Sequence, residues 1–206
     1  FASQYQCAFR FNSYIGLAVA GSLHGIPGIA AMGIVVGLMV PPANLAAVWM
    51  LARHGEAGVL RELLRNPLIL ATLAGIAANL GCLELPTAAL KLLGRLGDAA
   101  IVLGLLAVGG GLRIVGAGGT ATHLAAGYFL LVKLVAMPAI ALLLIRAFGL
   151  NGVHADVALI FAALPAASSA YILAQRMGGD GARVAWLISA GTLASMLGIP
   201  FWLGLR

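Results

Sequence analysis

Long apolar runs fill almost the whole chain and constrain its fold more than any other feature. A membrane-spanning helix needs about 20 mostly apolar residues, and Gly, Pro and charged residues divide the chain into runs of that kind. Only 9% of the residues are charged, against about 25% in a typical soluble domain. The sequence therefore predicts an all-α polytopic membrane protein and excludes a soluble enzyme. The seven predicted spans are 8–24, 27–52, 67–83, 87–112, 121–148, 155–175 and 182–205.

The positive charges indicate how these spans lie in the membrane. The segment 53–66 carries Arg53, Arg61 and Arg65, the densest basic cluster of the chain. Cytoplasmic loops are enriched in Lys and Arg, so we place this segment in the cytoplasm. Alternation from there puts Arg10 on the inside as well. We interpret the net charge of +6 as a sign of orientation and not of nucleic-acid binding.

Polar residues near the centre of a predicted span carry more information than the apolar ones around them. A polar group in hydrocarbon is costly unless a partner or a water-filled cavity receives it. The span 155–175 contains Pro165 with Ser168 and Ser169 close behind. Proline removes a backbone donor and clashes with the preceding turn. This segment alone is compatible with a kink or with a break, and a break would leave a helix N-terminus suited to an anion.

A second interrupted span favours the break. Near the start of the chain, Asn12, Ser13 and Tyr14 interrupt an apolar run, and a turn at Gly25 follows. The same order of polar joint, half-helix, glycine turn and long span recurs around Pro165, five spans later. An odd offset makes the two copies inverted. Interrupted spans in corresponding positions of two inverted halves point to the substrate site of a secondary transporter.

Lys133 lies near the middle of the predicted span 121–148, too deep for its side chain to reach the membrane surface fully. One interpretation is that it balances an anionic substrate or fills a place where other carriers hold a cation. The other is a structural lysine bonded to the carbonyl groups of a broken neighbouring helix. The sequence leaves both interpretations open.

Motifs for other chemistry are missing. The chain has no HExxH, GxSxG or phosphate-binding glycine motif, and its four histidines lie at span ends or in loops. We therefore expect no metal site, no cofactor and no enzyme activity.

The sequence resembles the auxin efflux carrier family of membrane transport proteins. The resemblance rests on LPAASSAYILAQ at 164–175, GGD at 178–180 and SAGTLAS at 189–195, with weaker likeness at NSYIGL (12–17) and around Lys133. It implies a ten-span carrier of two inverted five-span repeats, in which discontinuous helices cross near mid-membrane beside the substrate site. Members move organic anions, among them auxin in plants and malate- or malonate-like acids in bacteria. The short loops resemble those of the bacterial permeases.

On this basis we predict one carrier domain over residues 1–206. It comprises the end of a first repeat (8–52), the cytoplasmic loop (53–66) and a second repeat (67–206), with seven of the expected ten spans and the first three absent. The predicted substrate-binding residues are Asn12, Ser13, Tyr14, Lys133, Pro165, Ser168 and Ser169.

The predicted function is secondary transport of a small organic anion, such as a mono- or dicarboxylate, across a bacterial inner membrane by alternating access. The expected partners are that anion and the lipid bilayer, without nucleic acid, and a homodimer is left open. A membrane sensor or binding subunit with the same fold, which does not transport, is the main alternative. A channel is the third.

Overall fold

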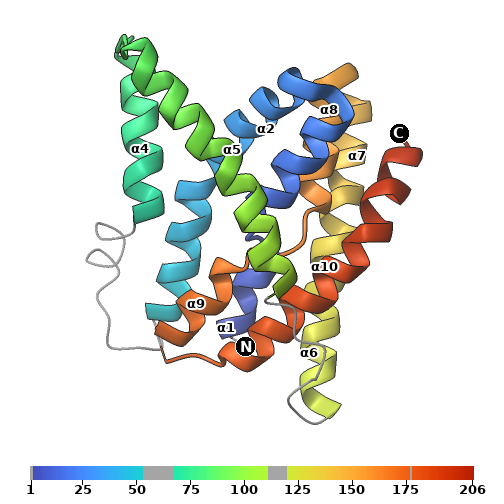
Figure 1. Ribbon diagram of the computed structural model, residues 1–206. Coiled ribbons are helices and arrows are strands. Elements are labelled where there is room, and N and C mark those ends of the chain that lie inside the picture. Colours follow the sequence, from blue (N-terminus) through green and yellow to red (C-terminus); the bar gives the residue numbers. More distant parts are fainter. Residues whose placement is uncertain (1, 53–66, 111–119, 177) are drawn as a thin grey trace.

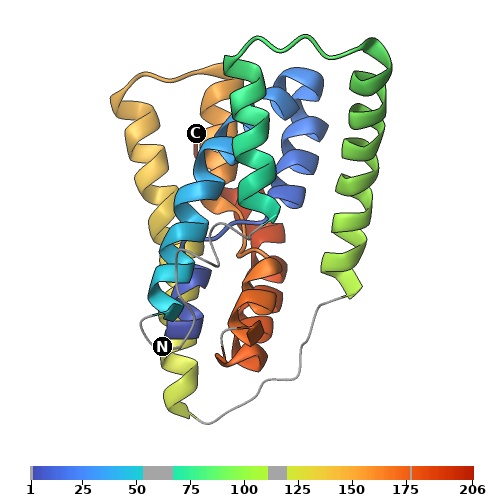
Figure 2. The ribbon, with the colours of Figure 1, turned by 90° about the vertical axis from the view of Figure 1, so that its left-hand side faces the viewer.

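The computed structural model describes residues 2–52, 67–110, 120–176 and 178–206, and its regular structure in these ranges is helical throughout. Two of the described spans are interrupted (Figures 1 and 2). Another described span contains a π-helical turn. The elements are α1 (Ala2–Tyr5), η1 (Gln6–Ala8), α2 (Ser13–Ala52), α4 (Pro67–Leu80), α5 (Thr87–Gly110), α6 (Thr120–Leu131), η2 (Val132–Ala136), α7 (Met137–Ala147), α8 (Gly152–Ala163), α9 (Ser169–Arg176) and α10 (Gly181–Gly204).

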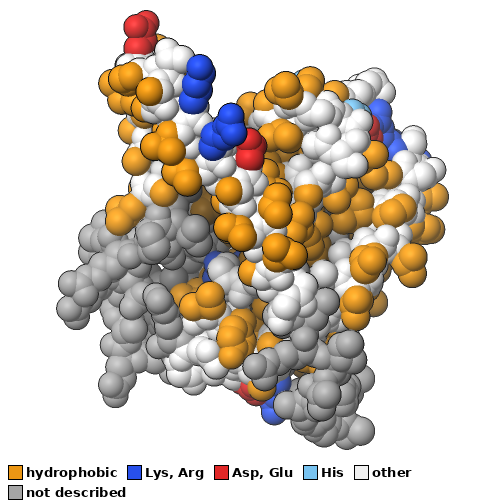
Figure 3. Space-filling model, viewed as in Figure 1, with side chains coloured by type: hydrophobic (Ala, Val, Ile, Leu, Met, Phe, Trp, Pro, Cys, Tyr) orange, Lys and Arg blue, Asp and Glu red, His pale blue; other side chains and the backbone are white. Residues whose placement is uncertain are grey.

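The surface of the bundle is apolar. Figure 3 shows hydrophobic side chains over much of the visible face, and Ile26, Leu106 and Leu197 are each more than half exposed. An apolar surface of this extent is unfavourable in water, whereas the hydrocarbon interior of a bilayer can surround it at little cost. Three helical stretches of the described chain are long and apolar enough to cross a membrane: Ser3–Ala47, Ala125–Ala147 and Gly181–Gly204. The predicted all-α polytopic membrane fold is confirmed.

The helix α2 is two helical arms that meet at Gly25. This glycine has φ 61° and ψ −141°, a conformation that L side chains rarely adopt. The chain folds back there, as the blue ribbon of Figure 1 shows. A side chain at Gly28 would overlap the carbonyl group of Ala20, so the two arms can approach this closely only with glycine. The predicted spans 8–24 and 27–52 therefore correspond to separate helical arms.

The second interrupted span breaks at Pro165, as predicted. The helix α8 ends at Ala163, Leu164 is extended with φ −60° and ψ 142°, and α9 begins at Ser169. Because proline cannot donate to the preceding turn, the helix has no continuous hydrogen-bond ladder across this point. The interruption is a break and not a kink.

The glycine turn after α9 closes the second copy of the pattern. Gly178 has φ 69°, and the amide of Gly179 donates to the carbonyl of Ala174 at 2.7 Å, which is the Schellman ending of a helix. Asp180 then caps α10 by accepting from the amide of Arg183 at 3.0 Å. Both interrupted spans thus lead through a glycine turn into a long helix.

The π-helical turn η2 lies in the middle of the α6–α7 span and contains Lys133. Pro138, five residues later, has no N–H and its ring crowds the carbonyl of Leu134, four residues before it. The indole Nε1 of Trp202 donates to that carbonyl at 3.0 Å. A partner from α10 therefore satisfies a backbone acceptor that the proline leaves open.

The interrupted spans form the centre of the molecule, and α4 and α5 lie to one side of it (Figures 1 and 2). Ala20, Met32, Ile160 and Leu164 belong to one apolar cluster that joins α2 to α8. The helix α5 approaches this centre where the ring of Tyr14 packs against Gly104. The space between α5 and the two breaks holds the candidate site.

Candidate functional site at the crossing of two broken helices

The two breaks meet each other. The amide of Asn12 donates to the carbonyl of Pro165 at 2.9 Å, so the first break is bonded directly to the second. Two side chains strengthen the junction: Arg10 Nη2 donates to Ser169 Oγ at 2.9 Å, and Gln6 Nε2 donates to the carbonyl of Ala170 at 3.1 Å. The predicted crossing of two discontinuous helices is confirmed.

Asn12 caps the first arm of α2. Its Oδ1 accepts from the amides of Tyr14 and Ile15 at 3.1 and 3.3 Å, which satisfies two of the free donors at the helix start. The side chain is only 2% exposed, and its Nδ2 has no partner among the described residues. A buried donor without a partner is costly, and here it adjoins a cavity that can hold a ligand.

Arg10 is the buried cation of the site. It is 6% exposed, and its other donor group bonds Gln6 Oε1 at 3.2 Å. Within the described part of the chain no carboxylate forms an ion pair with it. The interpretation of Arg10 as an orientation charge at the inner end of a span is wrong, because the guanidinium lies at the crossing. Its position two residues before Asn12, where the polar joint begins, is the signal that could have identified it.

The crossing opens into a cavity of about 610 Å³. The N-termini of α2 and α9 border this cavity and direct the positive ends of two helix dipoles toward it. No acidic side chain is present among the described residues that line it. The site therefore suits an anion with an apolar body. Its lining residues are Arg10, Phe11, Asn12, Ser13, Tyr14, Val36, Val40, Ala43, Asn44, Ala100, Leu103, Gly104, Ala107, Ala167, Ser168, Ser169 and Ile172.

The structure brings most of the predicted site residues together, but not all of them. Asn12, Ser13, Tyr14, Ser168 and Ser169 line the cavity. Besides Arg10, the polar lining residue that the sequence pattern did not single out is Asn44, which is 4% exposed on the second arm of α2. A single asparagine in an apolar span is a weak signal that could have identified it.

Lys133 and Pro165 lie next to the cavity without lining it. Lys133 is 3% exposed and faces a small separate void that Cys7, Pro165 and Gly191 also line. No carboxylate in the described residues forms an ion pair with this lysine. Lys133 is thus buried beside the second break and lies outside the cavity.

Two broken membrane helices that cross beside a cavity with a buried cation define a polytopic membrane transport protein. Residues 51–203 match the family model described as membrane transport protein. This match covers well over half of the chain, and the chain therefore belongs to that family, which confirms its resemblance to the auxin efflux carriers. The matched range includes Lys133 and Ser168 but not Arg10 or Asn12. Neither the curated proteins nor the solved structures give a match.

Proposed function

We propose that this protein is a secondary carrier of a small organic anion, such as a mono- or dicarboxylate. Its family establishes membrane transport, and the observation that carries the choice of an anion is the Arg10 guanidinium. This cation is buried, has no carboxylate partner in the described chain and lines the cavity. A buried charge without a counter-charge is strongly unfavourable, and a bound carboxylate would compensate it.

The cavity offers a carboxylate a set of converging donors. Arg10 and the free Nδ2 of Asn12 provide a charge-assisted and a neutral hydrogen bond. The hydroxyl groups of Ser13, Ser168 and Ser169 lie around the same two helix starts. In this proposal Lys133 raises the positive potential from behind Pro165 without touching the substrate.

Alternating access follows from the way the cavity is bounded. One wall is the crossed pair α2 and α9, and the other is α5, through Ala100, Leu103, Gly104 and Ala107. Movement of the crossed pair relative to α5 would open and close the cavity while the donors around Arg10 stay together. The Tyr14 ring against Gly104 is the contact that such a movement must change.

The setting of the carrier is part of the proposal. We place it in a bacterial inner membrane, with the segment 53–66, which lies outside the described residues, in the cytoplasm because of Arg53, Arg61 and Arg65. The partners are the anion and the bilayer, and a homodimer stays an untested alternative.

The direct test is uptake of radiolabelled malate and of a labelled monocarboxylate into liposomes that contain the purified chain. Arg10→Gln removes the cation and should lower uptake at limiting substrate by about tenfold or more, the value of a lost charged hydrogen bond. Lys91→Gln removes an exposed cation of α5 that does not line the cavity and is the matched control. Equal uptake by both variants and the wild type would refute the anion site.

Binding measurements separate the carrier from its alternatives. A ligand that binds the folded state raises the melting temperature by mass action, so a thermal-shift series with the same acids reports binding without flux. Saturable uptake together with such a shift supports the carrier. A shift without uptake supports the sensor, and uptake that never saturates supports a channel.

A further inference from the structure

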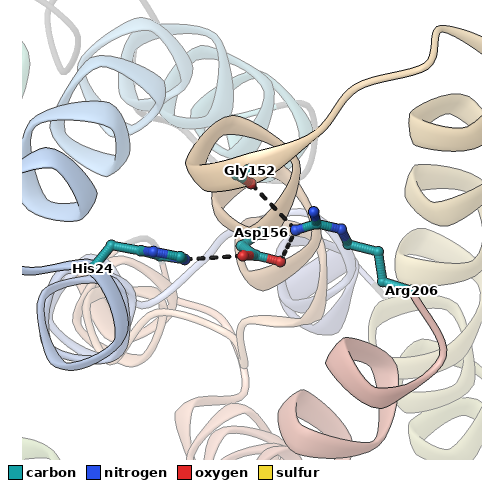
Figure 4. A network of polar contacts seen from close by, with 4 residues as sticks. All are labelled: His24, Gly152, Asp156 and Arg206. Carbon is teal, nitrogen blue, oxygen red and sulfur yellow. Dashed lines mark hydrogen bonds and ion pairs between the residues drawn. The ribbon is translucent and has the colours of Figure 1, made fainter.

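A second polar cluster joins the two broken spans at the end of the molecule away from the N-terminus. His24 lies at the end of the first arm of α2, Asp156 in α8, and Arg206 after α10 (Figure 4). The Nε2 of His24 lies 2.9 Å from Oδ2 of Asp156. Arg206 forms an ion pair with the other carboxylate oxygen and donates to the carbonyl of Gly152 at 3.2 Å. The carboxylate of Asp156 in α8 therefore contacts His24 of α2 and Arg206, which follows α10.

This cluster fixes α2 against α8 at a second point. The first point is the crossing itself, where Asn12 bonds Pro165. Between the two points the helices pack through an apolar cluster that includes Ala20, Val157 and Ile160. The angle between the broken spans is thus set at both ends, and the contact between His24 and Asp156 is the one that a change of charge can alter.

The protonation state of His24 decides what kind of contact this is. A neutral imidazole donates one N–H to the carboxylate, whereas a protonated imidazole forms an ion pair with it, and histidine is the side chain that ordinarily changes charge between pH 5 and 8. The side chains of His24 and Asp156 are 24% and 22% exposed, so protons reach them from water. Acid therefore strengthens the contact.

The other charged groups on α7, on α8 and after α10 leave that conclusion unchanged. Arg206 already pairs with Asp156, and Arg146 at the end of α7 donates to the carbonyl of Leu205 at 2.6 Å, which holds the turn that carries Arg206. His154 is exposed on α8, and no bond joins it to His24 or Asp156. Within the described chain, His24 is the histidine that contacts Asp156 in this cluster, and histidine is the residue type that ordinarily gains a proton as the pH falls below neutral.

We propose that His24 and Asp156 form a proton-sensitive tie between the two broken spans, which tightens when His24 is protonated. The tie is a property of the folded chain. Only its effect on the transport cycle rests on the proposed carrier function: at low pH on that side of the membrane, α2 and α8 move as one body.

The test compares the apparent melting temperatures of the full chain in detergent at pH 8 and pH 5.5. The substitution His24→Gln keeps an N–H donor for Asp156 but cannot be protonated, so it should lose an acid-dependent stabilisation of about 1–3 °C. The substitution His154→Gln removes the exposed histidine on α8, the helix that carries Asp156, and should keep the full acid response. Asp156→Asn should lose the response as well; if that variant does not fold, His24→Gln decides alone.

Equal acid responses of the wild type and His24→Gln, or loss of the response in His154→Gln alone, would overturn the tie. Uptake of labelled malate is measured on the same preparations. Absence of uptake in every preparation, with the acid response still dependent on His24, would count against the carrier function and not against the tie.

Discussion

Asn12 and Pro165 are joined by a backbone hydrogen bond of 2.9 Å, although 152 residues separate them in the sequence. Each lies at the point where its span stops being helical. Pro165 has no backbone N–H to donate within its own span. Its carbonyl oxygen accepts the hydrogen bond from the amide of Asn12 in the other span. The two interruptions therefore satisfy each other, and the polar backbone at the centre of the bundle finds its partner inside the protein, as a bilayer requires.

Asn12 has two separable functions, and two substitutions should divide them. Asn12→Ala removes the cap from the first arm of α2 and should cost about 1 kcal/mol of stability. Asn12→Asp keeps an oxygen for the amides of Tyr14 and Ile15 but brings a negative charge to the anion site. We expect the aspartate variant to fold and to lose uptake of labelled malate by more than tenfold. Melting temperature and uptake, measured together, check both expectations; uptake by Asn12→Asp at the wild-type rate would exclude Asn12 from the anion site.

Much of this centre could be predicted from the sequence because its causes are local. Pro165 disfavours a continuous helix because it lacks a donor and crowds the preceding turn, and Asn12 with Gly25 repeats the pattern that surrounds it. Arg10 could not be assigned in the same way. Its burial depends on Gln6 and Ser169, one of which lies 159 residues away, and a count of loop charges treats every arginine as exposed.

The position of Lys133 shows the same limit. Its depth in the membrane follows from its place in an apolar run, and the structure agrees that it is buried. Which side of the break it faces depends on the π-helical turn around it, since a wider turn rotates the side chains that follow. Trp202 of α10 donates to the carbonyl of Leu134 within this turn, and periodicity alone predicts neither the turn nor this bond.

Replacement of Lys133 by methionine should therefore affect the protein differently from replacement of Arg10. Methionine has a similar length, and exchange of a buried unpaired charge for an apolar group is often neutral or stabilising. We expect Lys133→Met to keep or raise the melting temperature and to lower the affinity for malate only a few-fold. Arg10→Met should lower the affinity by about tenfold or more, since it removes a direct bond. Concentration-dependent uptake gives both values; a larger loss in Lys133→Met would place the lysine in direct contact with substrate.

Gly16 lies close to the crossing, where neighbouring side chains leave no room for a Cβ. A Cβ at this position would lie 2.9 Å from Leu164 Cδ1 and 3.2 Å from the sulfur of Met32, both fully buried side chains. Gly16→Val should destabilise the protein by about 1–3 kcal/mol through overpacking. Gly33→Val is the control in the same element, because no atom lies within 4 Å of a Cβ there. Thermal unfolding of the two variants measures the difference, and equal melting temperatures would contradict the close packing at Leu164.

The bond between Trp202 and Leu134 explains why the span that carries Lys133 can hold a proline and a wide turn near mid-membrane. The indole Nε1 is the partner of a carbonyl that Pro138 leaves without its usual donor. Trp202→Phe preserves most of the ring contacts but leaves the carbonyl unsatisfied, which should cost about 1–3 kcal/mol. Phe201→Leu changes the neighbouring aromatic residue, which is 60% exposed, and should cost little. A loss of stability in Trp202→Phe alone, together with reduced uptake, would indicate that this bond also positions the Lys133 turn against the second break; unchanged unfolding would mean that the turn needs no partner from α10.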